Sequence, residues 1–318
     1  MNWELFHQLL SFDSTSGNER EVADWLLQTL QAPKKELFEV GDGTANLLFS
    51  WGTPRVVFCT HMDTVPPYIP PTFEEGVVKG RGSCDAKGQL FAMYTACKEL
   101  EAKGCTDFGL LLLAGEETGS WGAKAFSKTG FQAPFLIVGE PTENKMVSAS
   151  KGTLSYDLKF TGKPFHSGYP QYGLSAIDLF NEFYNTLKAK DWGMDPELGE
   201  TTWNVGLLHS DNPQNILSPE VTCRLYFRTT FVSHEKVKEW MKEGTLRGGD
   251  TPAHYRTLDG FESAPVAFGS DAPHLSGFGH KIICGPGTIR VAHRPDEHIL
   301  VADLEKAVEL YVKMYQSL

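Results

Sequence analysis

Two histidines and several carboxylates stand along the chain, each just after an apolar run or inside a turn-rich loop. Imidazole nitrogens and carboxylate oxygens are ligands that zinc prefers. One histidine could serve each of two metal ions, one carboxylate could bridge them, and an adjacent glutamate could take a proton from the attacking water. We therefore expect a two-metal hydrolytic site. The candidate residues are His61, Asp63, Asp85, Glu116, Glu117, Glu140 and His293.

Some of these residues also have an ordinary structural interpretation. Asp85 lies in a glycine-rich loop before an expected helix, so it could simply cap the helix N-terminus. Glu116 and Glu117 are harder to explain in this way, because two adjacent buried carboxylates repel each other and need cations. Asp63 follows His61 by two residues. At that spacing a carboxylate can hold the imidazole in its metal-binding tautomer.

The sequence pattern in the first half of the chain predicts the strands and helices that would bring these residues together. Strands alternate with helices there, which is typical of an α/β sheet covered on both faces. Ligands of such sheets gather at the carboxyl ends of the strands, and His61, Glu116 and Glu140 each follow an expected strand. The expected helices are 3–12, 19–31, 89–103 and 121–128, and the expected strands are 46–50, 55–60, 108–113 and 135–138.

A different pattern begins after residue 152, where half-solvated strands alternate with two helices. The order is β-α-β-β-α-β, the signature of a small ferredoxin-like domain. Its expected strands are 153–161, 202–209, 221–230 and 253–258, and its expected helices are 173–190 and 233–243. The α/β pattern then resumes with a helix at 270–276, a strand at 281–284 and a closing helix at 301–316. We predict that a catalytic domain of residues 1–152 and 259–318 is interrupted by a domain of residues 153–258.

Composition and charge argue against several classes of protein. The chain of 318 residues has 29 Lys and Arg against 40 Asp and Glu, a net charge of −11, and no long basic run, so we expect no nucleic-acid partner. No apolar stretch reaches about 18 residues, so we expect no membrane span. The segment Met1–Glu4 lacks a secretory signal pattern, and the 6 cysteines show no paired spacing. We therefore expect a cytoplasmic protein with reduced thiols.

Several short motifs, taken together, are specific enough to indicate a family. They are Ser14–Glu19, His61–Pro66, Gly80–Gly82 with Asp85–Gly88, Glu116–Glu117, Gly139–Thr142 and Phe165–Ser167. Over essentially its whole length, the chain resembles the zinc-dependent amidohydrolase family of acetylornithine deacetylase, succinyl-diaminopimelate desuccinylase, aminoacylase and glutamate carboxypeptidase. This resemblance implies a zinc-aminopeptidase-like catalytic α/β domain with an inserted ferredoxin-like α+β lid domain.

The resemblance also implies a metal content and a set of ligands. It implies two zinc ions per chain, with cobalt as a possible substitute for zinc. Asp85 would bridge the two ions. His61 and Glu140 would complete one site, and Glu117 and His293 would complete the other.

Further roles follow from the same resemblance. Glu116 would be the general base, and Asp63 would orient His61. His166, in the lid, would donate a hydrogen bond to the oxyanion, in many members from the partner subunit of a homodimer formed through the lid. Without the resemblance, His166 is simply an exposed loop histidine.

Two lid residues match those that bind the substrate in this family, namely Asn215 and Arg228. Arg228 also has an ordinary interpretation as a solvated strand residue, and Arg224 is a weaker candidate for the same role.

The sequence of the loop around His293 is the basis for predicting the substrate. Gly285–Ile289 and Ala292–Glu297 look most like acetylornithine deacetylase and related acyl-lysine deacylases. The first expectation is therefore hydrolysis of an N-acyl-L-amino acid, with N-acetylornithine giving ornithine and acetate in arginine biosynthesis. The alternatives are succinyl-diaminopimelate desuccinylase action, or dipeptidase or carboxypeptidase action. A non-catalytic binding protein would lack a ligand or the base, and none is missing. A nucleotide-binding protein would need a glycine-rich phosphate loop, which does not follow the first strand.

Overall fold

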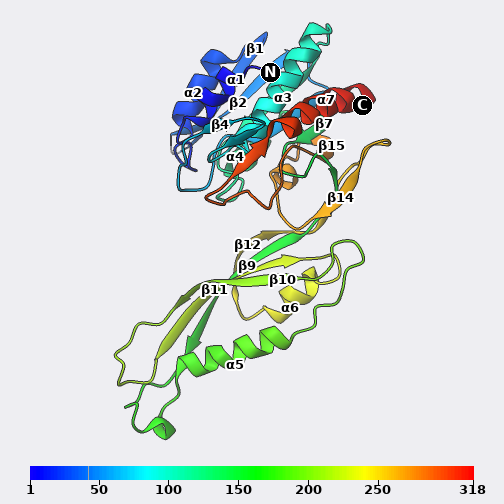
Figure 1. The fold of residues 1–318 in the computed structure, drawn as a ribbon. Helices are drawn as coiled ribbons and strands as arrows, with labels where there is room; N and C mark the ends of the chain where they lie inside the picture. The colour runs from blue at the N-terminus through cyan, green and yellow to red at the C-terminus, as the bar shows by residue number, and fades with distance from the viewer. Residues whose placement is uncertain (42) are drawn as a thin grey trace. The chain divides into compact units, whose positions relative to one another are not determined.

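The computed structural model of the protein describes residues 1–41 and 43–318 (Figure 1). Contacts between residues divide it into two units. The first unit consists of Met1–Ser148, Tyr255–Ala264 and Ser270–Leu318, and the second of Ala149–His254 and Pro265–Gly269. The chain therefore leaves the first unit and returns to it.

The first unit is built on a sheet of six strands in the order β1-β2-β6-β3-β7-β15. The strands β3, β6, β7 and β15 run parallel, whereas β1 and β2 add an antiparallel edge. The bounds are β1 Lys34–Gly41, β2 Thr44–Gly52, β3 Val56–His61, β6 Asp107–Leu113, β7 Ala133–Val138 and β15 Phe278–Ile283. The remaining strands outside the second unit's sheet are short: β4 Thr72–Glu74, β5 Val77–Lys79, β8 Met146–Ser150, β13 Ala253–His254, β14 Ser263–Val266 and β16 His298–Leu300.

Helices cover the sheet of the first unit. Their bounds are α1 Trp3–Leu10, α2 Arg20–Thr29, α3 Lys87–Ala102, α4 Trp121–Phe126 and α7 Val301–Ser317. The first core cluster joins α1, α2, α3 and α7 to one face, including Phe58 of β3 and Leu110 of β6. On β3 and β6 the neighbouring residues are buried as well, and α4 contacts β1 and β2. The central strands read as continuous apolar runs because both of their faces are buried.

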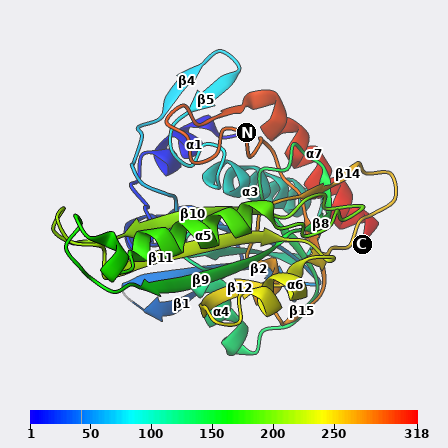
Figure 2. The ribbon, with the colours of Figure 1, turned by 90° about the horizontal axis from the view of Figure 1, so that it is seen from below.

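The second unit contains a four-stranded antiparallel sheet in the order β10-β11-β9-β12. Its elements are β9 Gly152–Thr161, α5 Ala176–Ala189, β10 Thr202–His209, β11 Glu220–Thr229, α6 His234–Trp240 and β12 Thr245–Asp250. Every second residue of β11 is buried, from Val221 to Phe227, as expected for a strand with helices on one face. Figure 2 shows α5 running along this sheet, where it contacts β9 and β11.

The structure differs from the predicted elements at several places. The predicted strand 253–258 is wrong, because β13 spans only Ala253–His254 and pairs with β8. The fourth strand of the second unit is instead β12, which pairs with β9 through a register shift near Gly248. The predicted helix 270–276 is reduced to a single 3₁₀ turn at Ala272–His274. The edge strand β1 was not predicted, because its half-exposed residues form no apolar run.

No helix among the described residues is long and apolar enough to cross a membrane. The cysteines are all free, and each of them is buried except Cys105, which is half-buried.

Candidate metal centre

The candidate site is built around His61, the last residue of the central strand β3. Its Nδ1 lies 2.9 Å from the main-chain oxygen of Asp63 and 3.3 Å from the Asp63 carboxylate. Its Nε2 therefore faces the opposite way, where it lies 3.2 Å from Oδ1 of Asp85. The imidazole is held on one side by Asp63 and presents its other nitrogen to the candidate metal ligands.

Asp85 places one carboxylate oxygen toward each histidine. Its Oδ1 lies 3.2 Å from Nε2 of His61, and its Oδ2 lies 3.3 Å from Nε2 of His293. Asp85 does not cap α3, because the N-cap is Ala86 and no described side chain caps the N-terminus of that helix. The capping interpretation of Asp85 is therefore wrong, and its two oxygens are available to two ions.

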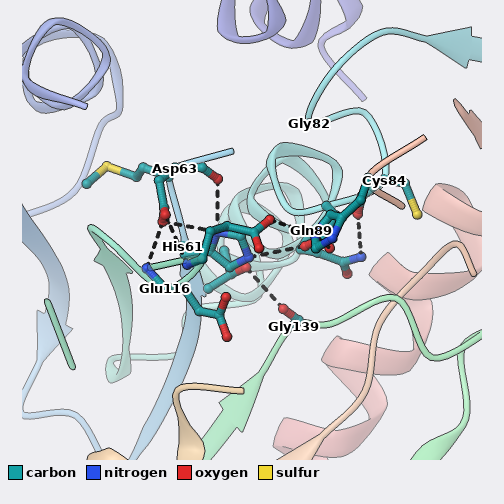
Figure 3. A network of polar contacts seen from close by, with 12 residues as sticks. His61, Asp63, Gly82, Cys84, Gln89, Glu116 and Gly139 are labelled. Atoms are coloured by element: carbon teal, nitrogen blue, oxygen red, sulfur yellow. Dashed lines mark hydrogen bonds and ion pairs between the residues drawn. The ribbon is translucent and has the colours of Figure 1, made fainter. Parts of the chain in front are cut away.

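The loop after β6 carries Glu116 and Glu117 and is held through its backbone (Figure 3). The amide of Glu116 donates to Oδ1 of Asp63 at 3.0 Å, and that of Glu117 donates to Oδ2 at 3.1 Å. The hydroxyl of Ser16 also donates to Asp63, at 2.7 Å. Asp63 thus fixes both the His61 ring and the loop of the two glutamates, a second task that its position in the sequence did not predict.

Glu117 follows β6 and Glu140 follows β7, the two strands that flank β3 in the sheet. Oε1 of Glu117 lies 2.9 Å from Nε2 of His293. Burial of Glu140, just beyond the end of β7, raises its pKa well above the usual value, and repulsion from Glu116 and Asp85 adds to this rise. The predicted ligands therefore come from strand ends and loops of the first unit, as the topology of an open α/β sheet favours.

Electrostatics distinguish the residues of this centre. Burial raises the pKa of Glu116 well above its usual value, and Asp271 and Glu117 add to this rise. Burial also works against ionisation of Asp85, but hydrogen bonds from His293 and His61 outweigh it and hold its pKa below the usual value. Hydrogen bonds to Asp85 and Glu117 raise the pKa of His293 to about 10. The carboxylates of this centre outnumber its histidines, so the centre favours cations.

The donor set fits zinc. Ligand atoms of His61, Asp85 and Glu117 all lie within 4.8 Å of one another. Ligands around a tetrahedral zinc ion with bonds of about 2.1 Å are separated by roughly 3.4 Å. The separations of 3.2 Å between His61 and Asp85 and 3.3 Å between His293 and Asp85 are close to that value.

Three buried carboxylates near the centre have no role in the sequence analysis. Glu19 accepts the amides of Gly17 at 2.8 Å and Gly115 at 3.0 Å. Glu297 accepts backbone amides of the loop that carries Asp85. Asp271 is 2% exposed, and its Oδ1 has no hydrogen-bond partner among the described residues. Glu19 and Glu297 both stand inside quoted motifs, which was the available signal for them.

The predicted lid residues all lie in the second unit. His166 and Asn215 belong to exposed loops that pair with each other, since His166 bridges to Ile216 and the amide of Ser167 donates to the oxygen of Asn215. Arg228 is half-buried on β11, opposite Thr153 of β9. Arg224 is engaged by Asp157 at 2.8 Å. The roles of His166, Asn215 and Arg228 stay predictions.

Comparisons with known proteins agree with this geometry. A peptidase M20 domain-containing protein of Schizosaccharomyces pombe is 32% identical, with 98% of this chain and 83% of that protein covered. A probable carboxypeptidase of Aspergillus terreus is 31% identical, with 98% and 85% covered. The model of peptidase family M20/M25/M40 matches residues 57–317.

Solved structures of related enzymes share the fold. A tripeptidase from Staphylococcus aureus superposes with a TM-score of 0.80 at 19% identity, covering 98% of this chain and 96% of that chain. An M20 family metallo-carboxypeptidase from Sulfolobus solfataricus superposes with a TM-score of 0.75 at 18% identity, covering 99% and 98%. With a mixed α/β fold and a metal-ligand cluster at its strand ends, the chain belongs to peptidase family M20/M25/M40 and is a metal-dependent amidohydrolase.

Proposed function

We propose that this protein hydrolyses the last peptide bond of short peptides and so releases the C-terminal amino acid. Two zinc ions would be held by the residues described above. The main support for the metal centre is the position of the Asp85 carboxylate between two histidines. One of its oxygens lies 3.2 Å from His61 and the other lies 3.3 Å from His293. His61 and Glu140 would hold one ion, and Glu117 and His293 the other. Bound zinc supplies a Lewis acid for the amide carbonyl and lowers the pKa of water.

The residues of the chain would then handle the proton and the substrate. Glu116 would take the proton of the attacking water and deliver it to the leaving amine. Its backbone is fixed by Asp63, so the carboxylate can be presented in one orientation. His166 would donate a hydrogen bond to the oxyanion that forms at the carbonyl, a contribution worth roughly 3–4 kcal/mol for one good donor.

A carboxylate on the substrate would be recognised by the second unit. Burial lowers the pKa of Lys151, and repulsion from nearby Arg228 lowers it further. Two cations near each other suit a free C-terminal carboxylate, and the planar guanidinium can bind it in a bidentate manner. Asn215 would hold the neighbouring polar groups, with the second unit acting as a lid over the substrate.

The comparisons favour peptides over the N-acetylornithine expected from the loop around His293. Several relatives at 30–31% identity over 96–98% of the chain are named probable carboxypeptidases. None of the relatives described above is named a deacetylase, so the closeness to acetylornithine deacetylase is not supported. Peptidase action was the alternative in the sequence analysis, and we adopt it here.

We also propose that the protein forms a homodimer through the second unit and works in the cytoplasm. Strand β10 is the outer strand of its sheet, and its residues Leu207 and Leu208 are 48% and 55% exposed. Exposed apolar side chains on an unpaired sheet edge favour pairing with a second chain. The six free cysteines suit a reducing compartment.

A substrate panel tests the proposed function. The zinc- or cobalt-loaded protein should hydrolyse dipeptides and tripeptides with a free carboxylate. Their C-terminal amides should react about 100-fold more slowly in kcat/KM, because the closed site would leave Arg228 unpaired. N-acetylornithine and N-succinyl-diaminopimelate belong in the same panel.

Each outcome of the panel has a distinct meaning. Equal rates for acids and amides would remove Arg228 from carboxylate recognition. A preference for N-acetylornithine over every peptide would restore the deacetylase assignment. No hydrolysis of any amide by protein with two bound zinc ions would contradict the proposal as a whole.

A further inference from the structure

A buried ion pair joins two residues outside the predicted set of ligands and bases. Nη1 of Arg81 lies 2.5 Å from Oε2 of Glu297, and their side chains are 2% and 0% exposed. We propose that this pair is a positioning device for the metal centre. It fixes the main chain of Asp85, ties it to the loop that carries His293, and so sets the affinity for zinc. This inference rests on the metal binding proposed above.

The first observation concerns the second carboxylate oxygen of Glu297. Oε1 accepts three backbone amides: from Gly82 at 2.9 Å, from Cys84 at 3.1 Å and from Asp85 at 3.1 Å. The loop therefore wraps around a single oxygen, in the manner of a backbone nest around an anion. Glu297 thereby fixes the main chain of Asp85, whose two side-chain oxygens face His61 and His293.

The second observation concerns Arg81. Its Nε donates to the oxygen of Pro67 at 3.2 Å, and Nη1 also donates to the oxygen of Arg294 at 3.3 Å. Its amide donates to the oxygen of Ile69 at 3.0 Å. One side chain thus connects the loop after β3, the loop of Asp85 and the residue that follows His293.

The loop of His293 needs such a support. His293 has a φ of 64°, in the left-handed region that residues other than glycine and asparagine rarely adopt, and its side chain is 49% exposed. Packing alone therefore does little to fix its ring. Hydrogen bonds from the Arg81 side chain to the oxygen of Arg294 and from the Gly80 amide to the oxygen of Glu297 hold the chain just beyond His293.

The charge balance also fits positioning. A buried ion pair is often no more stabilising than apolar residues of the same size, so stability alone is a weak reason for it. The positive charge of Arg81 balances the negative charge of Glu297. The Glu297 carboxylate can therefore accept three backbone amides without adding net charge next to Asp85. Residues that do not bind the metal but hydrogen-bond its ligands typically matter for binding: replacing one weakens metal affinity about 10–100-fold.

The experiment measures zinc affinity in competition with a chelator and records the absorption spectrum of the cobalt-loaded protein. Glu297→Asp keeps the charge but withdraws the carboxylate by one methylene, and Arg81→Lys keeps the charge but loses the planar fork. We expect both variants to bind zinc about 10–100-fold more weakly. Their cobalt spectra should also change, which a loss of overall stability would not cause.

The matched control is Asp107→Asn, which removes the partner of Arg55 in another ion pair. That pair, at 2.7 Å, joins the starts of β3 and β6, the opposite ends of the strands from the site. Asp107→Asn should lower the melting temperature and leave zinc affinity and the cobalt spectrum unchanged.

A measurement on the unaltered protein does not depend on any variant folding. The amides of Gly82, Cys84 and Asp85 should exchange hydrogen slowly in metal-free protein, because Glu297 and not the metal holds them. Rapid exchange there, or folded Glu297→Asp and Arg81→Lys proteins with unchanged zinc affinity and spectra, would overturn the inference. Unaltered protein that binds no zinc, or Asp85→Asn protein that binds it equally well, would instead contradict the proposed metal centre.

Discussion

At the scale of single residues, Glu116 and Glu117 share a loop but have different neighbours. Glu117 contacts His293 at 2.9 Å, whereas burial, together with repulsion from Asp271 and Glu117, raises the pKa of Glu116 well above its usual value. We predict that Glu116→Gln lowers kcat by at least about 100-fold, because the proton acceptor is lost while the shape is kept. Zinc content, measured by atomic absorption, should stay near that of the unaltered protein.

Glu117→Gln is the natural comparison for that experiment. It should lower zinc content, because Glu117 is the proposed ligand and contacts His293. If Glu116→Gln loses zinc while Glu117→Gln retains it, the two roles are exchanged.

Glu19 provides a prediction about pH. Burial raises the pKa of Glu19 to about 7, although two backbone amides favour its charged form. Between pH 4.5 and 7 the folded protein keeps a proton that the unfolded chain releases, so this group makes stability fall as pH rises. We expect urea denaturation of metal-free protein to show that Glu19→Gln removes at most about 3 kcal/mol of this pH dependence.

Glu21→Gln, on the exposed side of α2, is the matched control for Glu19→Gln. It should leave the dependence of stability on pH as it is in the unaltered protein. The same dependence in the Glu19→Gln protein would show that Glu19 is ionised throughout this range.

The sequence predicted side chains at this scale better than their backbone partners. The structure brings His61, Asp85 and Glu117 together, and it places His293 against Asp85. The roles of Asp63 toward the Glu116 amide and of Glu297 toward the Asp85 amide were not predicted. Hydrogen bonds from backbone amides do not depend on the donor's residue type, so no pattern of side chains reveals them.

At the scale of elements, the short helix α4 fixes the loop that carries the two glutamates. Gly122 of α4 donates its amide to the oxygen of Ala114 at 3.1 Å, and Asn46 of β2 bonds to both of these residues. A Cβ on Gly122 would lie 2.1 Å from the oxygen of Ala114 and 2.7 Å from Oδ1 of Asn46. There is no room for even a methyl group.

We predict that Gly122→Ala pushes α4 away from the end of β6. The protein should lose about 1–3 kcal/mol of unfolding free energy, as overpacked cores do. The activity of the folded variant should fall as well, because the loop of Glu116 moves with α4. Gly269→Ala is the control, since a Cβ there meets nothing within 4 Å. Equal stability of the two variants in thermal melts would argue against this tight packing.

Elements with a regular apolar pattern were the predictable ones. The strand predicted at 202–209 is β10, and the helix predicted at 301–316 is α7 with one residue more. In β12, Gly248 and Gly249 interrupt the alternation, and the strand pairs with the outer edge of β9. That pairing is a long-range contact, which a local sequence pattern does not contain.

At the scale of the whole molecule, the excess of buried carboxylates should link stability to metal. Burial and repulsion between carboxylates raise the pKa values of Glu116, Glu117 and Glu140. Cations that relieve that repulsion would bind the folded state more tightly than the unfolded chain and so stabilise it. We predict that chelation abolishes activity and lowers the melting temperature, and that two equivalents of zinc restore both. Full activity after complete removal of metal would contradict the metal centre.

The first unit is formed by segments before and after the second unit, so the ribosome makes its last part only after the second unit. His61, Asp85, Glu117 and Glu140 precede the second unit, whereas His293 and Glu297 follow it. Strand β15 and helix α7, which complete the sheet and cover α3, also come last. A ribosome adding about 5–20 residues per second therefore exposes an unfinished apolar surface for several seconds. We therefore expect the nascent chain to engage chaperones, and a product that stops before residue 293 would lack one of the proposed metal ligands.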